Sequence, residues 1–468
     1  MNNGKLKYKH ALALYPNNFG LMGFPPIGLE YIAVNMKDLV GKVTLMDLRY
    51  EEVYQDPKKL NEFISSEIDL LCISIVWDKK FEDVCDFVAQ LPSDVTTVVG
   101  GYKATLEVEY LFKRCPNIDV IVRGEGEEII QQIAKGLPYE DILGLSYQER
   151  GHIIHNKNHP LSDITTIRFP DRSLRRNDYY IRKEGIRLSN RTFDSILSTR
   201  GCPFKCKFCT FSLNPLGQKR TYTERPVESV IEELKTITAD IVAFSDENFF
   251  TNPVRSELLC DLIIQNNIKK TFIAQTRIDI SKFPGTLKKA EKAGFKFLLI
   301  GIESPHDRIL KQLQKGITNQ QVRDAFSVLA QFNFFLLGYF IYGNITETEE
   351  EMLYIPKFAK EIKLDFIVLS NLRIEKYSSL KETVAATPGY YYETVSGSVY
   401  SEHFGPKELK RIAKLNRSDF FDFIQMLHIL KKLWKINLAR WSDLMDIPKL
   451  CLFCFVRYKR KLRKLTVK

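Results

Sequence analysis

Near its middle the chain reads Ser198-Thr199-Arg200-Gly201-Cys202-Pro203-Phe204-Lys205-Cys206-Lys207-Phe208-Cys209. The three cysteines have the spacing C-x3-C-x2-C and follow a short apolar, strand-like pair, Ile196 and Leu197. This spacing puts three thiolates on one tight loop, where they can bind three irons of a 4Fe-4S cluster. The fourth iron then has no protein ligand and stays open for a substrate or cosubstrate. We therefore predict that Cys202, Cys206 and Cys209 are metal ligands of a catalytic cluster.

Two other uses of these cysteines are less consistent with the sequence. A structural zinc site is normally completed to four ligands by a second Cys or His pair. The only other C-x2-C pair, Cys451 and Cys454, lies far away in a basic C-terminal segment, where it could bind an auxiliary metal. Disulfides are disfavoured because the nine cysteines are an odd number and no secretory signal precedes them. We expect a reducing, cytoplasmic compartment.

Length and composition predict a globular protein of about three domains. The chain has 468 residues, 44% of them hydrophobic, and no run of eighteen apolar residues that would predict a membrane span. Its formal charge is +11, and no acidic residue follows Asp446. Eight basic residues do follow it: Lys449, Arg457, Lys459, Arg460, Lys461, Arg463, Lys464 and Lys468. This basic tail is a candidate partner-binding element.

The first part of the chain, residues 1–135, alternates short apolar strands with helical segments. We expect strands over 11–15, 43–46, 70–76, 97–100 and 120–122, and helices over 29–38, 81–91 and 127–135. Such alternation predicts an α/β fold, a doubly wound, Rossmann-like parallel sheet that binds ligands at the carboxyl ends of its strands. The candidate ligand-binding residues at these ends are Ser74, Trp77, Gly100, Gly101, Gly124 and Glu125.

Alternation of strands and helices returns after the cysteines. Residues 196–370 predict a partial TIM-type (β/α)6 barrel, with strands over 241–245, 271–275, 297–302, 335–342 and 366–369. Residues 136–195 are predicted as a linker, in which His152, His155 and His159 are interpreted as a solvated hairpin and not as metal ligands. Residues 371–468 are predicted as a helical, aromatic extension, because apolar residues recur there at helical spacing from Glu408 onward.

The motifs resemble a known family at several points. The cysteine triplet, with Phe208 directly before the third cysteine, is similar to the signature of radical S-adenosylmethionine (SAM) enzymes, whose open iron chelates SAM. The run 25–29, the Gly100-Gly101 pair and the run 123–127 resemble the cobalamin-binding domain of cobalamin-dependent radical SAM enzymes. That group includes the anaerobic protoporphyrin ester cyclases and the lipid and natural-product C-methylases. The resemblance implies three cofactors: a 4Fe-4S cluster, SAM and cobalamin.

The resemblance also implies which residues of the barrel contact SAM. The segment with Ser245, Asp246 and Glu247 is similar to the one that receives the SAM amino group. Gln275 and Arg277 end the next strand, where Arg277 could pair with the SAM carboxylate as a fork. The remaining cofactor-binding candidates are Phe208, Glu303, which resembles an acid that contacts the SAM ribose or amino acid part, and Gly343, on the strand that passes beneath adenine.

Two departures from the family concern cobalamin. Tyr102 and Lys103 follow the paired glycines where the family often has proline and histidine, and no D-x-H-x-x-G motif supplies an axial histidine. Many members of the family lack that histidine, so cobalamin stays a predicted cofactor. The alternative is a degenerate domain that keeps the fold as a cap on the substrate side.

The resemblance implies a radical SAM enzyme that generates a 5′-deoxyadenosyl radical for methyl transfer to an unactivated carbon of a hydrophobic or lipid-like substrate. A radical oxidase or cyclase is the first alternative, and an RNA-binding or RNA-modifying iron-sulfur protein is an alternative of another class. An external donor such as flavodoxin or ferredoxin would supply the electron. Basic residues beside apolar ones in the tail suit contact with the inner face of an anionic membrane. An RNA contact would use the same charges. The third alternative is a solvated helix end that binds neither a membrane nor RNA.

Overall fold

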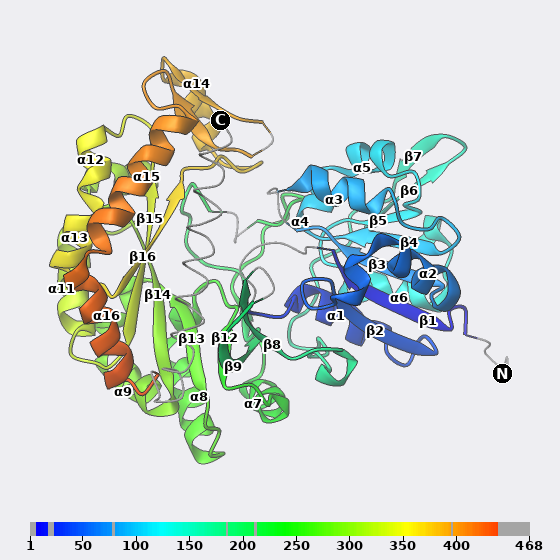
Figure 1. Ribbon diagram of the computed structural model, residues 1–468, viewed down its shortest axis with the longest axis horizontal. Coiled ribbons are helices and arrows are strands. Elements are labelled where there is room, and N and C mark those ends of the chain that lie inside the picture. The colour runs from blue at the N-terminus through cyan, green and yellow to red at the C-terminus, as the bar shows by residue number, and fades with distance from the viewer. Residues whose placement is uncertain are drawn as a thin grey trace.

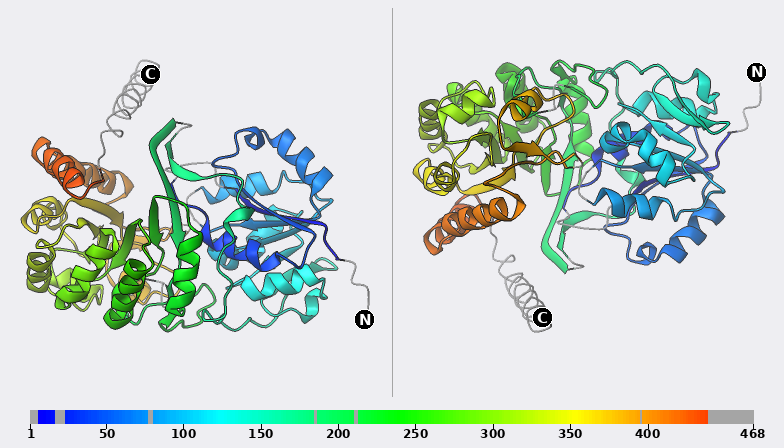
Figure 2. Two further views of the ribbon diagram at one scale, coloured as in Figure 1. Left: turned by 90° about the horizontal axis from the view of Figure 1, so that it is seen from below. Right: turned by 90° about the horizontal axis from the view of Figure 1, so that it is seen from above.

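The computed structural model describes residues 6–16, 23–76, 80–183, 186–209, 213–394 and 396–438. These residues form two lobes, each built on its own sheet (Figure 1). The first lobe contains the N-terminal residues, and the second contains the cysteine loop and the C-terminal helices. The lobes lie side by side in all three views (Figure 2). None of the described helices is long and apolar enough to cross a membrane.

The first lobe contains a sheet of strand order β2-β1-β3-β4-β5-β6-β7 among the described residues. Its strands are β1 (His10–Tyr15), β2 (Lys42–Asp47), β3 (Leu70–Ser74), β4 (Thr96–Gly100), β5 (Val120–Val122), β6 (Leu145–Glu149) and β7 (His152–His155). The first five run parallel, and β6 and β7 continue the sheet antiparallel. The order 2-1-3-4-5 is a doubly wound topology, as predicted, with its ligand side at the carboxyl strand ends.

Helices cover both faces of this first sheet. They are α1 (Ile27–Met36), α2 (Pro57–Glu67), α3 (Phe81–Val88), α4 (Tyr102–Leu106), α5 (Val108–Arg114) and α6 (Glu127–Lys135). One core cluster joins the sheet to α1 and α6, and a second joins its other face to α2, α3 and α5. Strands buried on both faces read as continuous apolar runs, which is why the sequence showed them clearly.

The second lobe contains a sheet of order β16-β15-β14-β13-β12-β9-β8. Its strands are β8 (Tyr179–Lys183), β9 (Ile186–Ile196), β12 (Ile241–Phe244), β13 (Thr271–Thr276), β14 (Phe295–Glu303), β15 (Phe335–Tyr342) and β16 (Phe366–Asn371). Six of them, β9 and β12 to β16, run parallel in chain order, which confirms the predicted open (β/α)6 barrel. Strand β8 adds an antiparallel edge.

Helices cover the outer face of this open barrel (Figure 1). They are α7 (Val227–Thr236), α8 (Pro253–Gln265), α9 (Pro284–Ala293), α10 (Asp307–Gln312), α11 (Asn319–Leu329), α12 (Glu349–Leu353) and α13 (Ile355–Glu361). On β13, Phe272 and Ala274 are buried toward the helices, whereas Ile273 and Gln275 are half-buried. This alternation leaves the inner face of the barrel accessible.

The C-terminal extension packs on the same lobe. It consists of α14 (Leu380–Ala386), the hairpin β17 (Tyr390–Tyr392) and β18 (Val399–Ser401), α15 (Pro406–Phe420) and α16 (Phe423–Lys435). The periodic apolar pattern predicted a helical region here, and the structure divides it near Phe421, where Asp422 caps α16 by accepting a hydrogen bond from the Gln425 amide. The basic tail, with Cys451 and Cys454, lies outside the described residues.

The segment predicted as a linker contributes to both sheets. The hairpin of β6 and β7 extends the first sheet beyond residue 135, and β8 and β9 belong to the second. His152 and His155 lie on the hairpin, as the sequence predicted, and His155 contacts Ser146 Oγ through Nδ1 at 2.8 Å.

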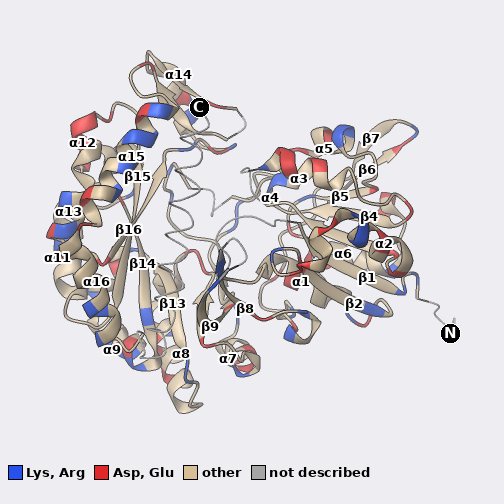
Figure 3. Ribbon diagram, viewed as in Figure 1, with Lys and Arg blue, Asp and Glu red and all other residues tan. Residues whose placement is uncertain are grey.

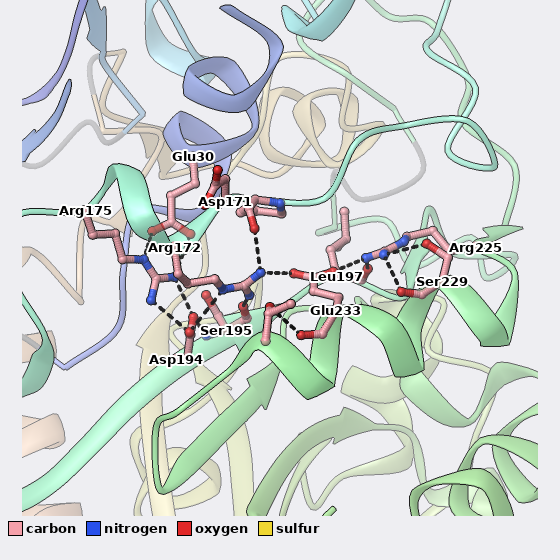
Figure 4. Close-up of polar contacts among 12 residues, drawn as sticks. Glu30, Asp171, Arg172, Arg175, Asp194, Ser195, Leu197, Arg225, Ser229 and Glu233 are labelled. Carbon is pink, nitrogen blue, oxygen red and sulfur yellow. Dashed lines mark hydrogen bonds and ion pairs between the residues drawn. The ribbon is translucent and has the colours of Figure 1, made fainter. Parts of the chain in front are cut away.

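Charged side chains from this segment join the two lobes (Figure 4). Arg175 pairs with Glu30 of α1 at 2.5 Å and with Asp194 of β9 at 2.7 Å. Arg172 contacts Asp194 and also Glu233 of α7, the latter at 2.7 Å. Glu233 in turn pairs with the fully buried Arg225 at 2.5 Å. A continuous ionic network therefore runs from the first lobe into the barrel.

Candidate active site between the two lobes

The cysteine loop begins where the short strand β10 (Thr199–Arg200) ends. Strand β10 pairs antiparallel with β11 (Thr223–Glu224), which fixes the backbone just before the first cysteine. Gly201 has φ +83°, and a Cβ atom there would lie 2.6 Å from the Thr221 carbonyl oxygen. Only glycine accepts both this conformation and this approach. The glycine before the first cysteine is therefore required by the turn that presents the loop.

Contacts from distant loops hold the cysteine loop in place. The Lys207 amide donates to the Leu313 carbonyl at 3.0 Å, and Ser378 Oγ donates to the Lys207 carbonyl at 2.6 Å. Phe208 packs against a buried apolar cluster that includes Leu313, Leu372 and Val399. These contacts fix the backbone on which the thiols are mounted, which is the preorganisation that a metal centre needs.

The three thiols are half-buried and free of disulfides. In the described residues no three side chains of His, Cys, Asp or Glu converge as ligands of one ion would. A cluster binds each thiolate to a different iron, so its ligands need not converge on one point. Burial raises the pKa of Cys202, and a bound metal would replace that proton. The donor set therefore fits a 4Fe-4S cluster.

A guanidinium lies directly over this loop. Arg277 Nη1 is 3.8 Å from Cys206 Sγ, and the Arg277 guanidinium is 3.8 Å from the centre of the Phe204 ring. Arg277 is also held by Asp279 at 3.0 Å and by the Lys315 carbonyl at 2.9 Å. A fixed positive charge beside the thiols would stabilise an anionic cluster or a bound carboxylate.

Glu303 lies near the same loop, where the structure pairs it with a residue that the sequence did not suggest. Lys315 Nζ donates to Glu303 Oε1 at 2.6 Å, and both side chains are buried. The same ammonium is 5.7 Å from the centre of the Phe208 ring. Glu303 has φ +72° at the end of β14, a strained conformation for a residue with a side chain. Arg277, Glu303 and Lys315 thus form a polar group around the loop.

The other barrel residues predicted to contact SAM have different surroundings. Asp246 is fully buried and accepts hydrogen bonds from the Ser198 amide at 2.7 Å and from Ser198 Oγ at 2.5 Å, so it supports the start of the cysteine loop. Ser245 and Gln275 are half-buried at the ends of β12 and β13. Gly343 has φ +72° after β15, where a Cβ would lie 2.7 Å from Asn371 Oδ1.

A cavity of about 410 Å³ lies between the two lobes at the carboxyl ends of β3, β4 and β5. The predicted residues Ser74, Gly100, Gly101, Gly124 and Glu125 line it, and so does Glu247 from the barrel. Trp77 lies outside the described residues. The volume falls within the range of roughly 300–1,000 Å³ that is usual for small-molecule sites. The structure therefore brings most of the predicted first-lobe residues together at one cavity.

The walls of this cavity are mostly apolar, with side chains such as Leu29, Ile32, Val98 and Val122. Gly28, the second residue of α1, lines the cavity, and a Cβ there would have no neighbour within 4 Å. In the part of the chain that the structure describes, no histidine lines the cavity, in agreement with the missing D-x-H-x-x-G motif. The residues present therefore fit a corrin bound without a protein imidazole.

Two arginines of the barrel reach across this cavity to the first lobe. Arg220 Nε donates to Glu125 Oε1 at 2.9 Å, and Arg200 pairs with Glu127 at the start of α6. Although burial opposes it, the charge of Arg200 holds the pKa of Glu127 below its ordinary value. Arg200 stands two residues before Cys202, so these pairs connect the rim of the cavity to the cysteine loop.

Glu247 is the cavity carboxylate for which no such pair is seen. Its Oε2 is buried without a hydrogen-bond partner among the described residues. Burial, with a smaller contribution from the charge of Asp246, raises the pKa of Glu247 to about 7, although hydrogen bonds from backbone amides and the charge of Arg200 oppose the shift. Glu247 can therefore hold or release a proton near neutral pH at the boundary between the cavity and the cysteine loop.

Glu247→Gln is expected to stabilise the protein without cofactors at about pH 8 by on the order of 2 kcal/mol, and to have little effect at about pH 5. The folded state keeps the proton of Glu247 to a higher pH than the unfolded state does, so its stability falls as pH rises toward the raised pKa. Chemical denaturation at both pH values tests this.

Glu347→Gln is the matched comparison for this prediction. Glu347 is also buried with a pKa raised to about 7 by burial, but it does not line the cavity. It should show the same pH-dependent gain. A destabilising effect of Glu247→Gln at the higher pH would instead mean that the carboxylate is ionised and paired.

Comparison with known proteins agrees with this division of the chain. Residues 22–134 match the B12 binding domain, and residues 196–359 match the radical SAM superfamily. The fold and the two matches define an enzyme in which a B12-binding domain precedes a radical SAM domain, and they confirm the resemblance found in the sequence. These domains imply a 4Fe-4S cluster, SAM and cobalamin as cofactors, as predicted.

Individual relatives cover most of this arrangement. The chain is 29% identical over 426 residues to the uncharacterized methyltransferase PH0819 of Pyrococcus horikoshii. The aligned region covers 87% of this chain and 89% of that protein. It is 26% identical over 330 residues to the anaerobic magnesium-protoporphyrin IX monomethyl ester cyclase of Synechocystis sp. This alignment covers 67% of this chain and 64% of the cyclase. The structure of the radical SAM methyltransferase TsrM of Kitasatospora setae, with cobalamin and a [4Fe-4S] cluster bound, has the same fold, with TM-score 0.64 and 16% identity over 93% of this chain and 92% of that one.

Sequence reasoning did not find Arg200, Arg220 or Lys315 as site residues. The carboxylate that each one pairs with lies in another segment of the chain: Glu127, for instance, is 73 positions from Arg200. The position of Arg200 inside the cysteine run was the one local signal that could have indicated a role.

Proposed function

We propose that this enzyme uses a cluster at Cys202, Cys206 and Cys209 to cleave SAM reductively, and that it methylates an unactivated carbon of a hydrophobic or lipid-like substrate. When bound, the cluster and SAM supply a 5′-deoxyadenosyl radical, and cobalamin supplies the methyl group. The observation that carries this proposal is that Arg200, two residues before Cys202, lines the cavity together with Glu247 of the barrel and the glycine-rich strand ends of the first lobe. The two cofactor sites are therefore contiguous.

The chain's own residues would bind and orient the reactants at this junction. Arg277 would hold the SAM carboxylate close to Cys206, and Lys315 would hold the Glu303 carboxylate in place near the loop. Apolar walls and the pairs of Arg200 and Arg220 would exclude water from the cavity. Glu247 would accept or return a proton there. The hard chemistry belongs to the cofactors, and the protein supplies orientation.

The names of relatives support methyl transfer as the outcome. Besides the methyltransferase of Pyrococcus horikoshii, they include the hopanoid C-3 methylase of Methylococcus capsulatus, 24% identical over 63% of this chain and 56% of that protein. Radical oxidation or ring closure is the second candidate, because the ester cyclases are relatives at similar identity. Trapping the product of a labelled methyl-SAM reaction distinguishes them, since only methyl transfer puts the label on the substrate.

Two partners belong to this proposal. An external electron donor such as flavodoxin or ferredoxin would reduce the cluster, because reductive cleavage of SAM consumes an electron. The basic, apolar C-terminal residues would contact an anionic membrane surface on its inner face.

Gly28→Leu is expected to prevent cobalamin binding while leaving the cluster intact. The second position of α1 accepts any side chain, and a leucine there would project into the open cavity. We expect bound corrinoid after reconstitution and desalting to fall more than tenfold, with iron content unchanged. Absorption and iron analysis measure both quantities on one sample.

Gly285→Leu is the matched control. Gly285 is the second residue of α9, a helix of the same length as α1, and it is exposed outside the cavity. It should bind cobalamin like the wild type. Undiminished corrinoid binding by Gly28→Leu would place the cofactor elsewhere, and absence of corrinoid from the wild type would favour the oxidase or cyclase reaction.

A further inference from the structure

Helix α16 carries two apolar rows instead of the single row that a surface helix needs. The first row, with Ile429 and the partly buried Leu433, packs against Phe335 of β15 and Ile436 after the helix. Gln425 continues this row and donates to the Leu364 carbonyl at 2.9 Å. These contacts are enough to dock the helix on the barrel.

The second row of α16 is exposed. Phe423, Leu427, Leu430 and Trp434 are spaced by four, three and four residues, so they share one face of the helix. Their exposed fractions are 76%, 50%, 58% and 45%, and neighbouring Ile424 is 77% exposed. In the sequence this periodicity predicts a buried face. A contiguous exposed row of large apolar side chains on a folded protein indicates an interaction surface.

Basic residues outnumber acidic ones on α16 and on the helix before it. Between Pro406 and Leu438, which spans α15 and α16, there are eight basic residues and three acidic ones. The basic residues are Lys407, Lys410, Arg411, Lys414, Arg417, Lys431, Lys432 and Lys435. Figure 3 shows Lys and Arg on both helices. Helix α16 lies at the outer edge of the barrel lobe, away from the first lobe (Figure 1).

We propose that the outer face of α16, formed by Phe423, Ile424, Leu427, Leu430 and Trp434, docks on an anionic lipid surface. Apolar side chains would enter the boundary between headgroups and acyl chains, while the adjacent lysines meet anionic headgroups. The charge argues against two other occupants. Residues 457–468 of the chain's own tail contain seven basic residues and no acidic one, and a second copy would bring the same lysines face to face, so both would be repelled.

This inference rests on the membrane contact proposed above and names the surface that makes it. Its test is flotation of the full chain with phosphatidylcholine vesicles, with and without phosphatidylglycerol. We expect flotation only with phosphatidylglycerol, and weaker flotation in high salt. The double variant Phe423→Glu with Leu427→Glu should lower the vesicle-bound fraction at least tenfold.

The matched control is Val254→Glu with Leu258→Glu on α8. These residues are also four apart near a helix start, and they are 79% and 48% exposed. This variant carries the same charge change and should float like the wild type. An equal loss of vesicle binding in both double variants would mean that the change in net charge explains the effect, and it would overturn the proposal.

Other outcomes separate the alternatives. If the α16 variant floats normally while Lys459→Glu with Arg460→Glu does not, the tail alone makes the contact. If light scattering shows a wild-type dimer that the α16 variant abolishes, the occupant is a second copy. Either result overturns the role of α16. Reductant-dependent SAM cleavage, measured on the same variants, should be unchanged, so that failure of the docking proposal is distinguishable from failure of the proposed chemistry.

Discussion

Cys206→Ala is expected to abolish reductant-dependent SAM cleavage. Loss of one of three thiolates leaves two loop ligands, and a cluster held by two ligands loses iron. Loss of an outer-shell partner already costs a metal site about 10- to 100-fold, so loss of a ligand should exceed about 100-fold. Anaerobic reconstitution, followed by iron and sulfide analysis and by quantification of 5′-deoxyadenosine, measures both effects.

The control for this variant is Cys260→Ala. Cys260 is buried in α8 within the barrel core, away from the cysteine loop, and burial raises its pKa to about 12. The substitution should retain the cluster and SAM cleavage, because Cys260 is a packing residue. Full iron content and cleavage in Cys206→Ala would contradict the ligand assignment. A matched loss in Cys260→Ala would show that general destabilisation, not ligation, explains the result.

Glu233→Ala is expected to cost about 3–5 kcal/mol of stability, because it leaves a buried ion pair without one partner. The Glu233 carboxylate is fully buried between Arg225, whose side chain is 1% exposed, and Arg172. Without it, Arg225 keeps its charge in a buried site, and Arg172 is left with Asp194 (Figure 4). Chemical denaturation followed by circular dichroism should show the lower midpoint.

Glu232→Ala is the control one residue away on the same helix. Its carboxylate is 63% exposed and pairs with Lys235 at 2.8 Å. Exposed pairs of this kind contribute less than about 1 kcal/mol. We expect the loss of stability in Glu233→Gln to lie between those of Glu232→Ala and Glu233→Ala, since glutamine keeps one hydrogen bond but not the charge. Equal effects of Glu232→Ala and Glu233→Ala would mean that the network in Figure 4 does not carry stability.

Local sequence was sufficient for the parts of the fold that depend on periodicity. Buried parallel strands appear as short apolar runs, and all five predicted strands of the first sheet are present, although the third ends at Ser74 instead of residue 76. The hairpin of β6 and β7 lies in the segment predicted as a linker, and its membership of the first sheet was not predicted. Pairing between strands is a long-range property, and β-branched residues alone do not specify the partner.

For the site, the amino-acid sequence by itself determined the cysteine loop, because the three thiols and the glycine before them lie within nine residues, where spacing alone sets their proximity. It also determined the glycine-rich strand ends of the first lobe. The tertiary structure decided what spacing cannot: that Arg200 and Arg220 meet Glu127 and Glu125 across the cavity, and that one apolar row of α16 faces outward. The physical reason is that backbone geometry fixes neighbours within a turn or a strand, whereas contacts between lobes depend on how two separately folded sheets pack.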